Sequence, residues 1–124
     1  MLFPDDGDVA SPDVSWSFTG FGMFRRWLAR TEGFALADMD GFGGERRWND
    51  VSTTLTPLLH HPDDGGPDLA PDRCAAMLPR LEALLDGRPA DESDPVVRQH
   101  LDDLRQLVAV LRYCVEKDVG LVFG

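Results

Sequence analysis

Apolar side chains recur every three or four residues in three segments of the chain, at about 20–31, 71–86 and 95–118. This spacing places them on one face of an α-helix, so the pattern predicts three helices. The ends of these segments carry residues that favour helix boundaries, namely Thr19, Gly33, Pro71 and Asp94-Pro95. Pro79 lies inside the second segment and is expected to kink or break that helix. The third segment is the most regular, with apolar residues at Leu101, Leu104, Leu107, Val108, Leu111 and Val115.

Shorter patterns predict minor strand content. Apolar and serine residues alternate over residues 14–18, which predicts a short strand. Leu121–Phe123 predicts a second strand, and the two are expected to pair. Between the helices, the apolar patch of Phe34, Leu36 and Met39 predicts a single helical turn. The glycines of residues 41–44 break regular structure.

The chain has the size of one ordinary domain. It contains 124 residues, of which 43% are hydrophobic, so it can bury a core without disulfides. Residues 1–12 are acidic and interrupted by proline and glycine, which predicts a flexible acidic N-terminal arm. We therefore expect a single globular domain over 13–124, mainly α with minor β-strand content.

An acidic loop occupies residues 60–72, between a short helix capped by Thr53 or Thr54 and the helix from Pro71. Helix, acidic loop with glycine and helix is the plan of an EF-hand. If His61 is position 1 of the loop, that position is an imidazole and position 5 is Gly65. Calcium needs about six to eight oxygen ligands. The loop is therefore expected to be a degenerate EF-hand-like helix-loop-helix that holds no metal.

Acidic residues dominate the charge of the chain, whose formal net charge is −10. Residues 25–47 differ, because five arginines and four carboxylates give them a net charge of +1 (5 − 4). An acidic chain repels phosphate backbones and anionic lipid, so no nucleic-acid or membrane partner is expected. A peptide substrate or a cationic protein partner is expected instead.

Two cysteines, Cys74 and Cys114, lie among apolar residues at helical positions. They are interpreted either as buried free thiols in a reducing cytoplasm or as a disulfide. Neither a signal peptide nor an apolar run of membrane-spanning length is visible in the sequence. A cytoplasmic protein is therefore expected.

His60 and His61 are the candidate catalytic residues, at the start of the acidic loop. A neutral imidazole is a good general base near neutral pH. Adjacent residues of a helix diverge by about 100°, so the pair is a poor site for one metal ion. The alternative is structural, with one histidine at the helix end and the other in solvent.

Three arginines, Arg25, Arg26 and Arg30, are candidate substrate-binding residues on the first helix. Guanidinium groups suit the recognition of a carboxylate, although ion pairs with the chain's own aspartates are the alternative. Trp16 and Trp48 are the candidate aromatic contacts for a peptide, if they are not part of the core. The sequence contains no signature of a nucleophilic, metal or nucleotide site, so no cofactor is expected.

Three segments carry a resemblance to a known family. They are residues 13–25 with Trp16, Phe18 and Phe24-Arg25, residues 41–48 with Gly41-Phe42-Gly43-Gly44 and Trp48, and residues 55–74 with Pro57-Leu58-Leu59 and His61. They resemble a family of small, uncharacterised actinobacterial proteins with an EF-hand-like loop. The chain is also similar, in size, acidity and aromatic content, to the lysinoalanine-forming proteins of cinnamycin-type and duramycin-type lanthipeptide clusters.

Two functions follow as hypotheses. The second resemblance implies an enzyme of lanthipeptide maturation, which adds a lysine amine of a peptide to a dehydroalanine. This addition needs positioning and general base catalysis, and a homodimer holding the peptide at its interface could supply both. The alternative is a non-catalytic acidic module that binds a protein or peptide.

Overall fold

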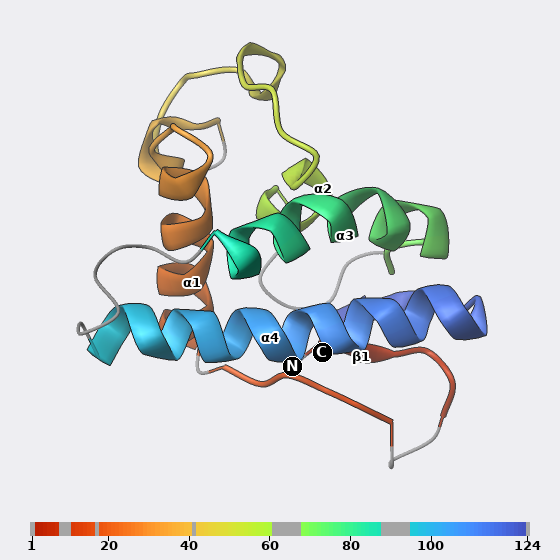
Figure 1. Ribbon diagram of the computed structural model, residues 1–124. Helices are drawn as coiled ribbons and strands as arrows, with labels where there is room; N and C mark the ends of the chain where they lie inside the picture. Colours follow the sequence, from red (N-terminus) through yellow and green to blue (C-terminus); the bar gives the residue numbers. More distant parts are fainter. Residues whose placement is uncertain are drawn as a thin grey trace. The chain divides into compact units, whose positions relative to one another are not determined.

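The computed structural model describes residues 2–7, 11–16, 18–40, 42–60, 68–87 and 95–123 (Figure 1). The fold is mainly α with minor β content, which confirms the predicted fold class. In chain order, its elements are β1 (Leu2–Pro4), α1 (Phe18–Thr31), the 3-10 turns η1 (Leu36–Asp38) and η2 (Trp48–Asp50), α2 (Thr56–Leu59), α3 (Pro71–Asp86), α4 (Pro95–Lys117) and β2 (Leu121–Phe123).

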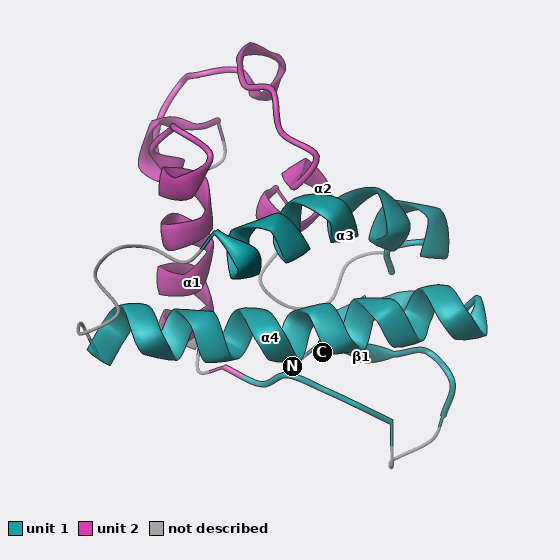
Figure 2. Cartoon of the chain, viewed as in Figure 1, with its two compact units in different colours: residues 1–15, 64–124 teal, residues 16–63 magenta. Residues whose placement is uncertain are grey.

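The chain forms two compact units, which Figure 2 colours separately. Unit 1 comprises residues 1–15 and 64–124, and unit 2 comprises residues 16–63. Unit 1 therefore contains both strands with α3 and α4, whereas unit 2 contains α1, η1, η2 and α2. The sequence pattern, which predicts an arm followed by one domain over 13–124, gives no sign of this division.

Helix α4 is the central element of unit 1, because both α3 and β1 pack against it (Figure 1). Two neighbours explain why its buried residues cover a wide arc of the helix. Apolar positions from Leu101 to Leu111 are buried as predicted, but Val115 is 38% exposed and Cys114 is buried in its place. Two polar residues, His100 and Asp103, are also buried in α4.

Helix α3 continues through Pro79, so the break that the proline predicts is not found. Proline removes one backbone hydrogen bond from a helix. Here the ring of Pro79 is exposed, while Met77 and Leu81 on either side of it are fully buried. Packing of the buried face therefore holds the helix together at the position where the backbone is weakest.

The sheet of unit 1 joins the two ends of the chain. β1 and β2 are antiparallel, with Leu2 opposite Phe123 and Pro4 opposite Leu121. Single bridges extend the sheet on both sides, where Val14 pairs with Leu2 and Leu69 pairs with Leu121. The predicted strand at Leu121–Phe123 is confirmed. Its partner is β1, however, and not residues 14–18.

The prediction of a strand over 14–18 is wrong. Within that segment Val14 forms one bridge, Ser17 lies outside the described residues, and Phe18 begins α1. The ring of Trp16 stacks on Phe21 and Phe24 of α1, with centroids 5.0 Å apart in each case. The tryptophan thus buries its apolar surface against a helix, and three alternating positions are too few to impose a sheet against that packing.

Other local predictions fare better. The apolar patch after α1 forms the single turn η1. The short helix before the acidic loop is α2, which ends at Leu59, but its N-cap is Leu55 and not Thr53 or Thr54. Residues 61–67 lie outside the described residues, so the EF-hand-like loop and its lack of metal stay predictions. No helix in the described part of the chain is long and apolar enough to cross a membrane.

A hydrogen-bonded cluster fastens the segment after β1 to α4. The carboxylate of Asp6 accepts bonds from the Ser11 hydroxyl at 2.6 Å and from the Tyr113 hydroxyl at 2.8 Å. The backbone N–H of Asp5 also donates to the carbonyl of Gly120 at 2.9 Å. Residues near the N-terminus that the sequence assigns to a flexible arm therefore have specific partners in unit 1.

Replacing Tyr113 by phenylalanine is expected to lower the free energy of unfolding by about 1 kcal/mol, because it removes one hydrogen bond to a carboxylate. Urea denaturation followed by circular dichroism measures this change. Arg105→Gln is the control, because it removes only the exposed pair with Asp102. Equal midpoints for Tyr113→Phe and the wild type would show that the cluster contributes nothing to stability.

Candidate functional site

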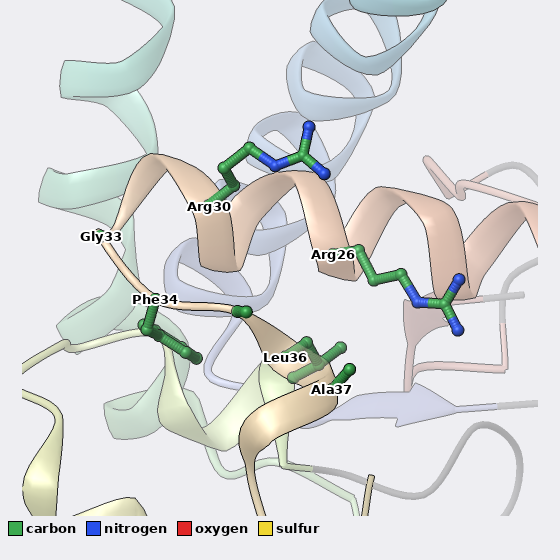
Figure 3. Close-up of a pocket in the computed structure, with 7 residues that line it drawn as sticks. Arg26, Arg30, Gly33, Phe34, Leu36 and Ala37 are labelled. Atoms are coloured by element: carbon green, nitrogen blue, oxygen red, sulfur yellow. The ribbon is translucent and has the colours of Figure 1, made fainter. Parts of the chain in front are cut away.

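Arg26 and Arg30 lie one turn apart on α1, in unit 2, and both side chains are exposed. Figure 3 shows that both leave the helix in the same direction, toward its N-terminal end. Among the residues that the structure describes, no carboxylate forms an ion pair with either guanidinium group. The two positive charges are therefore presented together on one helix face.

An open pocket of about 490 Å³ lies beside these arginines. Phe34 and Leu36, both nearly buried, supply an apolar surface, and Ala35 and Ala37 are small enough to leave it open. The pocket is shown in Figure 3, and its lining residues are Arg26, Arg30, Gly33, Phe34, Ala35, Leu36 and Ala37.

The chain reversal at the end of α1 builds this pocket. Gly33 has φ of 88°, a left-handed conformation that favours glycine and ends a helix. The backbone N–H of Gly33 donates to the backbone carbonyl of Arg30, and the backbone N–H of Phe34 donates to that of Ala29, each at 3.1 Å. The turn brings η1 back against α1. Gly33 therefore acts as the helix stop that the sequence predicts, and it also places Phe34 and Leu36 beside the arginines.

An aromatic group in unit 2 surrounds Trp48. The ring of His60 stacks on Trp48 with centroids 4.6 Å apart and planes at 17°. Phe34 and Phe42 contact the same indole by their edges, at 6.1 Å and 5.9 Å between centroids. The indole N–H donates to the carbonyl of Asp40 at 3.0 Å, which fixes the orientation of the ring. Phe34 is shared, because it both lines the arginine pocket and contacts Trp48.

The structure thus brings two sets of predicted site residues together. Arg26 and Arg30 share the pocket, and His60 and Trp48 share a stack. His60 is exposed and Trp48 is half-buried, so both rings can meet a ligand. Trp16 packs on α1 instead, and His61 lies outside the described residues.

Arg25 has a structural role that the sequence interpretation did not give it. Its side chain is only 1% exposed, and its Nε and Nη2 atoms donate to the carbonyl of Leu58 at 3.2 Å and 2.9 Å. The guanidinium carbon also lies 4.4 Å from the centre of the Phe21 ring. A buried group with these contacts holds α1 to α2 and does not face a ligand in solvent.

The pocket residues after α1 were missed as site residues. The sequence identifies Phe34 and Leu36 only as an apolar patch, because nothing in their spacing links them to Arg26 and Arg30. Gly33 could have indicated this contact. A glycine that ends a helix reverses the chain, so the apolar patch that follows it folds back toward the arginines that precede it. The burial of two polar residues of α4, His100 and Asp103, was not predicted either. The side-chain amide of Gln99 donates to the Asp103 carboxylate at 3.0 Å.

In unit 1, Cys74 of α3 and Cys114 of α4 are buried free thiols. A hydrogen bond between the two thiols is the main cause of opposite pKa shifts. It raises the pKa of Cys74, and burial raises it further. The same bond lowers the pKa of Cys114. The Cys114 sulfur also lies 3.6 Å from the carbonyl oxygen of Gly120. Of the two, Cys114 is therefore the one that ionises more easily.

Alkylation with iodoacetamide is expected to be much slower in the native protein than in urea, because both thiols are fully buried. The first thiol modified in the native state is expected to be Cys114, since the thiolate is the nucleophile. Peptide mass spectrometry over a time course measures both rates. Modification of Cys74 before Cys114 would contradict the direction of the two pKa shifts.

Comparisons with models of protein families, with curated protein sequences and with solved structures find no match to this chain. The chemistry of the two side-chain groups in unit 2 is therefore what indicates a function. An exposed arginine pair beside an apolar surface can bind a carboxylate attached to an apolar group, and an exposed ring stack can bind a peptide side chain.

Proposed function

We propose that this protein is a non-catalytic module that binds a peptide through unit 2. The observation that carries the proposal is the position of Phe34, which connects the arginine pocket to the stack of Trp48 and His60. Exposed tryptophan and arginine are the residues that contribute most to binding at protein interfaces. Here they are held by a hydrogen bond and a helix, so little freedom is lost when a peptide binds.

Selection from a library of random peptides, followed by calorimetry with the synthetic peptides, tests this function. Replacing Trp48 by alanine or His60 by alanine is expected to weaken binding about tenfold, because each change removes one ring of the stack. Met23→Ala is the control, because Met23 is 45% exposed on α1 and does not line the pocket. A library that yields no binder, or affinities that neither variant changes, would refute the proposal.

The second candidate is the lysinoalanine-forming enzyme. The observation that favours it is that His60, the proposed general base, lies against Trp48, a proposed peptide contact, with its ring exposed. In that reaction the lysine amine attacks the β-carbon of a dehydroalanine. The nitrogen loses one proton to the base, and the α-carbon gains one.

Incubation with a dehydrated, thioether-bridged peptide distinguishes the two candidates. The cross-link leaves the mass unchanged, so loss of the free lysine amine is measured by chemical labelling. Acceleration over the uncatalysed reaction that is lost in His60→Ala would favour the enzyme. Binding without any acceleration would leave the peptide-binding module.

A further inference from the structure

We propose that the pocket beside Arg26 and Arg30 binds the C-terminal residue of a peptide, with its free carboxylate on the arginines and its apolar side chain on Phe34 and Leu36. This inference rests on the proposed function and specifies which part of the peptide unit 2 recognises. Three features of the pocket support it: the lining residues, their charge and the volume.

The charge of the lining favours an anion. Among the lining residues that the structure describes, both polar side chains are arginines and none is acidic. The nearest acidic residue along the chain, Glu32, has a carboxylate oxygen that accepts a bond from the Thr53 hydroxyl at 2.8 Å. Arginine donates in a planar fork that matches a carboxylate. An external carboxylate is therefore the ligand group that this wall of the pocket fits.

The size and the apolar surface of the pocket require more than a small anion. At about 490 Å³ the pocket falls within the range of small-ligand sites, roughly 300–1,000 Å³. An inorganic anion would contact the arginines and leave the rest of the pocket filled with water. A terminal residue with an apolar side chain fills both parts, and its carboxylate and side chain share one α-carbon.

The acidity of the whole chain indicates which charge the rest of the peptide should carry. Charges separated by more than about 8 Å are screened at physiological ionic strength, so the pocket responds mainly to its own arginines. The net charge of −10 still favours a basic ligand during approach. The expected partner is therefore a peptide that is basic along its length and ends in an apolar residue with a free carboxylate.

An N-acetylated peptide of lysines and glycines that ends in phenylalanine is the probe, and calorimetry on the full chain is the measurement. We expect amidation of its C-terminus to weaken binding about tenfold, and each of Arg26→Gln and Arg30→Gln to weaken it about threefold, as is typical of exposed charged pairs. The double variant should bind the acid and the amide equally. The variant Arg73→Gln, Arg98→Gln has the same change of charge on exposed residues of unit 1 and should bind like the wild type.

Equal affinity of the acid and the amide, or wild-type affinity in the double arginine variant, would overturn this inference while peptide binding itself stands. Tighter binding of phenyl phosphate than of the peptide acid would also overturn it, because a phosphate would then be the preferred anion. Octanoate is a free carboxylate with an apolar chain, so it tests whether the pocket binds such acids without a peptide. If octanoate binds the wild type but not the double variant, while no peptide binds, the pocket takes free carboxylic acids and both the peptide terminus and the proposed function are wrong.

Discussion

Replacement of Arg25 by alanine is expected to lower the free energy of unfolding by about 3 kcal/mol. Both donors of its guanidinium group that contact Leu58 disappear, which leaves that carbonyl without its charged partner. The side chain is also among the largest that are fully buried, so its removal leaves a cavity. Urea denaturation followed by tryptophan fluorescence measures the loss.

Two further variants separate packing from charge at this position. Arg25→Met fills most of the volume and also removes the buried charge, so it should be less destabilising than Arg25→Ala. Arg26→Gln is the matched control at the next position, because its exposed side chain has no described ion pair. If Arg25→Met kept wild-type stability but lost affinity for the peptide, the predicted substrate-binding role of Arg25 would be restored and our structural assignment would be wrong.

Replacement of Gly44 by alanine is expected to lower the free energy of unfolding by about 2 kcal/mol, because the new methyl group would overlap the main-chain carbonyl of Asp38. That carbonyl accepts a bond from the N–H of Arg46 at 2.9 Å, so it has little freedom to move away. The bridges of Met39 to Arg46 and of Asp40 to Gly44 should open. The fluorescence of Trp48 reports this change, because its indole bonds to Asp40.

Gly22→Ala is the matched control for Gly44→Ala, because it is the same substitution with the opposite expected sign. Gly22 lies inside α1, and nothing lies within 4 Å of the position that a methyl group would take there. Alanine should stabilise the helix by about 0.5–1 kcal/mol. A destabilisation of equal size by both substitutions would indicate that overlap with Asp38 is not the cause.

The sequence predicts long elements well, because many residues contribute to one pattern. The apolar spacing of α4, from Leu101 to Val115, extends over about four turns of helix. A single residue such as Val115 can depart from it without changing the outcome. β1 has only three residues, and its partner lies at the other end of the chain. Beside an acidic segment rich in proline and glycine, such a strand has the composition of a loose arm, so composition alone does not reveal its pairing with β2.

The sequence predicts the candidate site only where helical spacing determines which face of the helix a side chain occupies. Arg26 and Arg30 are four residues apart, so they share a helix face. The same reasoning could have placed Arg25 correctly, because it lies four residues after Phe21 and three before Leu28, on the buried face of α1. The contacts of Phe34 with the pocket and with Trp48 could not be predicted, since they depend on how the turn at Gly33 directs the chain.

The pairing of β1 with β2 has a consequence for the order of events during synthesis. A ribosome adds about 5–20 residues per second. Leu2 is made before Phe123, the residue that it pairs with, and 120 residues lie between them in the sequence. All of unit 2, residues 16–63, is synthesised in the interval. β1 therefore stays an unpaired edge until residues 121–123 have been made, and the sheet of unit 1 closes only after that.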